Sequence, residues 1–200
     1  MQVIIRPEKD AVSELAAQII EKRIRKHPHS VLGLATGGTM ERLYALLVER
    51  HRKENLDFSL LRTYNLDEYI GIPAEHPNSY RSYMNKHLFS QVNIDLRNTY
   101  LPNGMAQNFR NECREYEKNI RLDGGVDLQL LGILEGGSKK ASFWAIVLGV
   151  RAFSRVLDLR ADSGSLKPMW PDFPMPKSCR STPPSRRIFF SYSRHSFLKF

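Results

Sequence analysis

Strand-length apolar runs alternate with amphipathic helical segments along the first 133 residues, and this alternation constrains the fold most. The expected strands are 2–7, 30–39 (ending in a glycine turn), 60–66, 99–104 and 126–133. The expected helices are 10–27, 40–54, 79–92 and 110–124. Such alternation is typical of βαβ units. The sequence therefore predicts an α/β fold, with a Rossmann-like, open, mostly parallel sheet and flanking helices.

The composition changes after Ile133, and this change defines the expected domain organisation. Residues 1–134 have 18 Lys/Arg and 17 Asp/Glu, whereas residues 135–200 have 12 and 4. Six of the eleven prolines lie between Pro168 and Pro184, a density that leaves little room for a helix or a central strand. We therefore expect an α/β domain over 1–167 and an irregular, disordered basic tail over 168–200.

Bulk properties exclude several classes of protein. No run is long and apolar enough to span a bilayer, and the N-terminal residues lack a signal-peptide core. The two cysteines, Cys113 and Cys179, form no CxxC spacing, which favours a reduced, cytoplasmic setting without a cysteine metal site. The net charge of +9 could attract nucleic acid, but the chain has no aromatic RNP motif. We expect no membrane or nucleic-acid partner.

The stretch ATGGT, Ala35–Thr39, joins an expected strand to an expected helix. Glycines at such a turn let the backbone approach a ligand. The hydroxyls of Thr36 and Thr39 and the free N–H groups at a helix start suit a phosphate. The alternative is a tight turn that needs glycine only for its positive φ angle. We take Thr36, Gly37, Gly38 and Thr39 as candidate phosphate-binding residues.

Asp67 and Glu68 lie where the strand at 60–66 should end, and the carboxyl ends of strands in open α/β sheets are where ligands bind. A carboxylate tuned by its surroundings can remove a proton from carbon beside a carbonyl or imine. We take Asp67 as the candidate base and Glu68 as a supporting group. The alternatives are a solvated loop pair or a helix N-cap.

The order of the motifs adds a family resemblance. LGLATGGTMERLYALLVE, YNLDEYIGIPAEHPNSYRSYM, LPNG, CREYEKNI and VDLQLLGI closely resemble the glucosamine-6-phosphate deaminase family over about residues 1–133. The resemblance implies conversion of glucosamine 6-phosphate and water to fructose 6-phosphate and ammonia, in amino-sugar catabolism. It assigns Asp67 as the C2 base and Thr36–Thr39 as the sugar-phosphate loop. It implies no metal or organic cofactor, and a homo-oligomer as a further partner.

The chain departs from the family pattern after Ile133. The family has a glycine-rich loop with a G-H-x-x-F-N-E-P core, whose aspartate, histidine and glutamate relay protons during ring opening. Here the sequence is LEGGSKKASFWAIVLG, which matches none of the three. Residues 152–167 resemble the family again. For one possible choice of synonymous codons, restoring a single nucleotide at Lys167 gives a family-like continuation. We therefore expect a frameshifted tail, an incomplete C-terminal sheet and a weakly active or inactive chain.

Two other functions remain open. A 6-phosphogluconolactonase-type sugar-phosphate hydrolase resembles the same fold and has a similar glycine loop, although DEYIGIPAEHPNSY argues against it. The other is a non-catalytic half-domain that binds sugar phosphate or partner subunits without turnover. Turnover of glucosamine 6-phosphate, as opposed to binding alone, distinguishes the half-domain from the deaminase.

Overall fold

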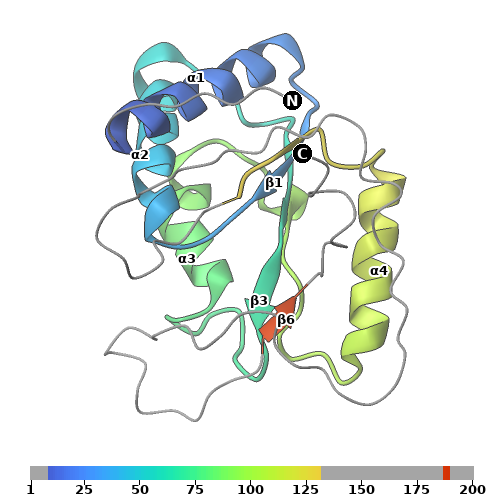
Figure 1. Cartoon of the computed structure of the whole chain (residues 1–200). Coiled ribbons are helices and arrows are strands. Elements are labelled where there is room, and N and C mark those ends of the chain that lie inside the picture. The colour runs from blue at the N-terminus through green and yellow to red at the C-terminus, as the bar shows by residue number, and fades with distance from the viewer. Residues whose placement is uncertain (1–8, 132–186, 190–200) are drawn as a thin grey trace, which may run out of the picture.

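Four parallel strands form the central sheet of the protein, seen in a computed structural model that describes residues 9–131 and 187–189 (Figure 1). They are β1 (Val31–Leu34), β2 (Arg62–Asn65), β4 (Thr99–Tyr100) and β5 (Leu128–Gln129). Their order across the sheet is β4-β2-β1-β5, and every adjacent pair is parallel. The predicted α/β fold with a mostly parallel sheet is confirmed. The strand expected at 2–7 lies outside the described residues.

Helices cover both faces of this sheet. The described helices are α1 (Lys9–Lys26), α2 (Gly38–Glu54), α3 (Tyr80–His87) and α4 (Phe109–Leu122), with the short 3-10 helices η1 (Phe89–Gln91) and η2 (Leu96–Asn98). In Figure 1, α4 stands on the opposite side of the strands from α1, α2 and α3. Right-handed crossovers explain this arrangement. The chain moves outward from β1 to β2 and β4, then returns through α4 to β5 on the other side of β1.

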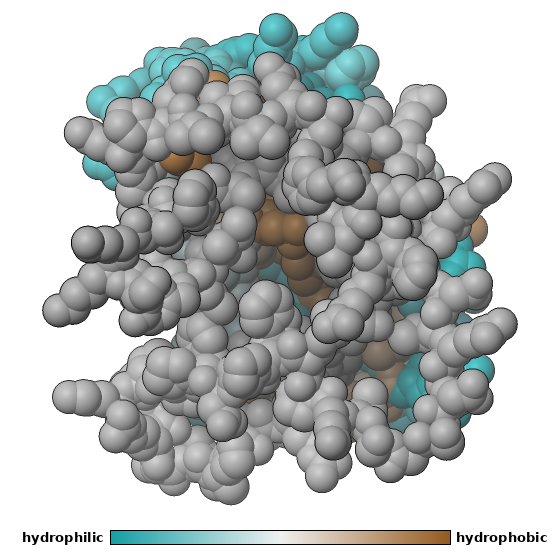
Figure 2. All heavy atoms as spheres, viewed as in Figure 1, coloured by the Kyte–Doolittle hydropathy of each residue, from teal (hydrophilic) through white to brown (hydrophobic). Residues whose placement is uncertain are grey.

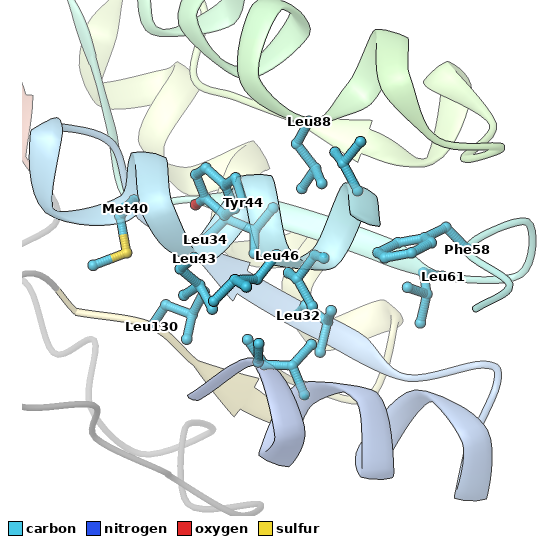
Figure 3. Packing of buried hydrophobic residues seen from close by; sticks show 14 of the residues in the cluster. Leu32, Leu34, Met40, Leu43, Tyr44, Leu46, Phe58, Leu61, Leu88 and Leu130 are labelled. Carbon is cyan, nitrogen blue, oxygen red and sulfur yellow. The ribbon is translucent and has the colours of Figure 1, made fainter. Parts of the chain in front are cut away.

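The strand β1 separates two apolar clusters. Leu32 and Leu34 face the larger cluster, which α1, α2 and α3 complete, and Figure 3 shows the α2 side chains Leu43 and Tyr44 packed there. Val31 faces the smaller cluster, against residues of α4 and β2. All four residues of β1 are buried, as expected for a central parallel strand. The sheet is therefore fixed from both sides.

The outer surface of α1 is polar. Hydrophilic residues cover the top of the molecule in Figure 2, where Figure 1 places α1. The exposed residues of α1 include Lys22, Arg25 and Lys26. Among the helices of the described ranges, none combines the length and the apolar character that a bilayer crossing requires.

A short strand that the sequence did not predict contains the two acidic candidates. It is β3 (Asp67–Tyr69), and it pairs antiparallel with β6 (Arg187–Phe189), as Figure 1 shows. Regular structure in 187–189 differs from the expectation of an irregular segment over 168–200, because backbone pairing with β3 stabilises a strand there. The expected boundary at 167, the rest of the tail and the expected incompleteness of the sheet fall outside the described residues.

The helix expected at 79–92 is shorter in the structure. Ser79 is its N-cap, and the Ser79 side chain accepts a hydrogen bond from the Ser82 N–H. The helix α3 ends at His87, and the next residue, Leu88, leaves the helical region with φ −142° and ψ −64°. The remaining residues form η1 instead of continuing the helix.

Candidate active site

The glycine turn and the acidic pair lie at the same edge of the sheet. Leu34 of β1 is the register partner of Asn65 of β2 in a parallel pair. Thr36 follows Leu34 by two residues, and Asp67 follows Asn65 by two. Since adjacent strands are about 4.8 Å apart, both segments emerge side by side. The edge is also next to the β1–β5 boundary, where the direction of strand order reverses and where open α/β sheets bind ligands.

The turn from β1 into α2 is shaped by Gly37. Its φ of 108° and ψ of 163° lie in a region that only glycine adopts readily, and it is the N-cap of α2 with no side-chain cap. A Cβ added at Gly37 or Gly38 would meet no described atom within 4 Å. The N–H groups of Gly38 and Thr39, in the first turn of α2, have no intrahelical acceptor. This geometry suits an anion.

Two tyrosine hydroxyls hold the carbonyl groups of this turn. The Tyr44 hydroxyl of α2 donates to the Ala35 carbonyl, and the Tyr83 hydroxyl of α3 donates to the Gly37 carbonyl at 2.8 Å. The Gly37 carbonyl also accepts from the Met40 N–H at 2.9 Å. Burial raises the pKa of both Tyr44 and Tyr83, which keeps the two hydroxyls protonated as donors.

Glu68 has a defined structural role in β3. Its side chain is buried, with 3% of the residue exposed. The carboxylate accepts hydrogen bonds from the backbone N–H groups of Tyr69 (2.9 Å), Tyr80 (2.8 Å) and Arg81 (3.0 Å). Two of these donors belong to the first turn of α3, where a negative charge is favoured. Glu68 is therefore a cap of α3, which is one of the alternatives that the sequence left open.

Asp67 occupies the other side of β3. Asp67 and Tyr69 are half-buried and Glu68 is buried between them, so strand alternation directs Asp67 away from the α3 cap. Glu68 is therefore the carboxylate that accepts hydrogen bonds from backbone N–H groups. Asp67 lies on the opposite side of β3 from the Glu68 side chain.

The end of β2 is held from the opposite face of the sheet by α4. The Tyr116 hydroxyl lies 2.8 Å from the Asn65 carbonyl oxygen and 3.0 Å from that of Tyr100. These carbonyls terminate β2 and β4 respectively. Asn65 is itself buried, and neither polar atom of its side chain has a hydrogen-bond partner among the described residues. Tyr116 therefore fixes the strand end from which Asp67 emerges.

The loop between Glu68 and α3 is ordered by its own backbone. The N–H of His76 donates to the Pro73 carbonyl at 3.0 Å, and that of Ser79 donates to the His76 carbonyl at 2.9 Å. Gly104 packs so closely here that an added Cβ would lie 2.0 Å from the Tyr69 carbonyl oxygen. The conformation of the loop is therefore set by its own backbone turns and by its close packing against Gly104, which follows β4.

The structure thus brings Thr36–Thr39 and Asp67 to one edge and gives Glu68 a capping role. Sequence reasoning did not identify Tyr83 or Tyr116, because a tyrosine within an amphipathic helix has the same pattern as a packing residue. The positions expected for the proton relay, after Ile133, lie outside the described residues.

Comparisons with known proteins identify the family of the chain. Residues 8–137 match the family model described as glucosamine-6-phosphate isomerases/6-phosphogluconolactonase. A glucosamine-6-phosphate deaminase of Geobacillus sp. (strain WCH70) is 50% identical over 137 residues, which cover 68% of this chain and 55% of the relative. The chain thus spans little more than half the length of the curated relatives it matches.

Solved structures give the same result for the fold. A monomeric glucosamine-6-phosphate deaminase superposes with a TM-score of 0.66 at 41% identity, covering 69% of this chain and 57% of that one. A 6-phosphogluconolactonase from Thermotoga maritima has a TM-score of 0.52 at 24% identity, covering 66% and 58%. This second similarity extends to the fold alone.

Proposed function

Because the chain belongs to the glucosamine-6-phosphate isomerase/6-phosphogluconolactonase family, we propose that it binds glucosamine 6-phosphate at the carboxyl edge of its sheet. The observation that supports this most is the shared position of the glycine turn and Asp67 after the register pair Leu34 and Asn65. With the two groups on adjacent strand ends, the anion site can hold the phosphate of a sugar phosphate while the carboxylate reaches the opposite end of the same sugar. The reaction we propose is isomerisation with deamination.

The phosphate is assigned to the turn Thr36–Thr39. Gly37 leaves the backbone uncovered, and α2 directs the N–H groups and the positive end of its dipole at the ligand. The Tyr44 and Tyr83 hydroxyls hold the Ala35 and Gly37 carbonyls. This leaves the opposite, N–H side of each peptide unit for the anion.

Asp67 is assigned as the base. In the open-chain sugar it takes the C2 proton, the electrons of the C–H bond form the C1=C2 bond of an enolamine, and the C1=O π electrons move to O1, which takes a proton from water. The proton returns to C1, which leaves an imine at C2. Water adds to that carbon and ammonia leaves, giving fructose 6-phosphate. The amine and aldehyde of the substrate delocalise the charge, so the proposal requires no organic cofactor or metal.

The lactonase alternative is less well supported than the deaminase. The 50%-identical relative and the 41%-identical structure are described as deaminases, whereas the lactonase structure is 24% identical. The non-catalytic alternative remains in part, since LEGGSKKASFW lacks the relay of the family. We therefore expect sugar-phosphate binding with little or no turnover by this 200-residue chain.

We place this activity in the cytoplasm, with the sugar phosphate as the partner. A homo-oligomer remains a prediction, and the 41%-identical structural relative is described as monomeric.

Three assays on the purified full chain test the proposed function. Calorimetry with glucosamine 6-phosphate should give saturable binding, and glucosamine without phosphate should bind far more weakly. Ammonia release should be slow or undetectable. Hydrolysis of 6-phosphogluconolactone above the buffer rate would favour the alternative enzyme, and equal affinity for glucosamine and its phosphate would refute the phosphate site.

A further inference from the structure

We infer that Tyr83 is a positioning residue of the glycine turn, and that α3 joins this turn and the Asp67 strand into one rigid unit. The inference rests on the proposed function, because it concerns the same phosphate site. Its physical basis is a single contact between elements far apart in the sequence. The Tyr83 hydroxyl lies 2.8 Å from the Gly37 carbonyl oxygen.

The contact orients a specific N–H group. The C=O and N–H of one trans peptide unit point in opposite directions, so an acceptor fixed at the Gly37 oxygen directs the Gly38 N–H away from α3. The Met40 N–H shares the same acceptor at 2.9 Å, which holds the oxygen toward the helix start. Gly37, with φ 108°, has more backbone freedom than other residues and therefore needs such a restraint.

The ring of Tyr83 has little freedom of its own. It is half-buried on α3 and lies against His87, with the ring centroids 4.4 Å apart and the planes tilted by 32°. Burial raises the pKa of the Tyr83 hydroxyl, so it remains a donor over the ordinary pH range. The Tyr83 hydroxyl is therefore a donor with a fixed position beside the Gly37 carbonyl oxygen.

The helix that contains Tyr83 is anchored at its other end to the acidic strand and to β4. Glu68 accepts from the Arg81 N–H at 3.0 Å. The Arg81 guanidinium donates to the Thr99 hydroxyl and the Thr99 carbonyl, both at 2.7 Å. Since Asp67 adjoins Glu68 in β3, α3 connects the base to the phosphate turn. A shift of α3 would change both parts of the site together.

The test compares the full chain with Tyr83→Phe and with a matched control, Tyr64→Phe. The control removes a tyrosine hydroxyl that donates to Asp123 at 2.6 Å, away from the glycine turn. Each variant is titrated with inorganic phosphate, and the Gly38 amide is followed by ¹H–¹⁵N NMR with and without the anion. Hydrogen exchange at Gly38 is measured in the free protein.

Tyr83→Phe should weaken phosphate binding about threefold to tenfold, the effect of one net hydrogen bond, while Tyr64→Phe changes it little. In the free protein it should also shift the Gly38 amide and speed its exchange. Unchanged affinity together with an unchanged Gly38 amide would overturn the inference. If the parent chain binds no phosphate, the proposed function fails, and the free-protein Gly38 signals still decide the role of Tyr83.

Discussion

The Glu68 carboxylate lies 2.8 Å from the backbone nitrogen of Tyr80, the first residue of α3. The two residues are twelve positions apart in the sequence, and the intervening loop contains Pro73 and Pro77. The contact ties the strand of Asp67 to the start of the helix that reaches the glycine turn. The acidic pair thus combines a structural carboxylate, Glu68, with the carboxylate that we propose as the base, Asp67.

Replacing Glu68 by Gln should destabilise the domain by about 1–3 kcal/mol, because buried N–H donors would lose their acceptor. A glutamine keeps one carbonyl oxygen, which can replace the oxygen that accepts from Tyr69 and Tyr80, but its amide N–H₂ group would then face the Arg81 N–H. Urea unfolding monitored by circular dichroism measures the loss. The matched control is Glu75→Gln in the same loop, where the side chain is exposed and a change close to zero is expected. Equal effects of the two changes would contradict the capping role.

The two glycines of the turn should respond differently to alanine. Gly37→Ala meets no described atom within 4 Å, so its cost is conformational, about 1–3 kcal/mol at φ 108°. Gly38 starts α2 without a positive φ, so Gly38→Ala should leave the fold equally stable or more stable. Thermal unfolding of the two variants compares them directly. A destabilised Gly38→Ala beside an unaffected Gly37→Ala would be inconsistent with this turn geometry.

Glu117 on α4 should make stability depend on pH. Burial raises its pKa above the ordinary value of 4.5, and one carboxylate oxygen has no hydrogen-bond partner among the described residues. The raised pKa means that the folded state favours the protonated acid. At low pH Glu117 is protonated and does not destabilise the folded state. As pH rises through 4.5 toward the higher pKa of the folded state, ionisation of Glu117 progressively lowers the free energy of unfolding.

Glu117→Gln should consequently gain stability relative to the parent as pH increases from about 4 to about 7. Urea midpoints at the two pH values give the measurement. Glu115→Gln, an exposed change on the same helix, is the control for the loss of a carboxylate. A gain that is constant with pH would show that the carboxyl titrates as it does in the unfolded chain.

Asp67→Asn tests the base. Incorporation of solvent deuterium at C1 of the fructose 6-phosphate formed from glucosamine 6-phosphate, followed by NMR over long incubations, detects even slow turnover. Asp67→Asn should lower the rate of this deuterium incorporation by about 10²-fold or more, while the affinity for phosphate changes little. Exchange at the parent rate would remove Asp67 from the proposed role.

Much of the architecture followed from periodicity alone. The buried run at β1 and the apolar stripe of α2 predicted a strand, a glycine turn and a helix in the observed order. The helix expected at 79–92 was too long, because amphipathic spacing continues through η1 although the backbone turns at Leu88. The strand β3 was missed because three residues that contain two carboxylates have no strand-like alternation.

The candidate site was predictable only in part. A glycine turn and an acidic pair are local motifs, so Thr36–Thr39 and Asp67 could be proposed from the sequence. The division of roles within the pair depends on where the first turn of α3 lies, and only the fold determines that Glu68 meets Tyr80 and Arg81. The Tyr83 contact spans 46 residues, and no sequence pattern indicates it.

The most direct test of the central claim is a ¹H–¹⁵N NMR titration of the full chain with glucosamine 6-phosphate, glucosamine and inorganic phosphate. Saturable shifts of the Gly37, Gly38 and Thr39 amides are expected with both phosphate-containing ligands, and none with glucosamine. Shifts confined to other parts of the chain, or shifts of these amides with glucosamine alone, would contradict a phosphate site at the start of α2.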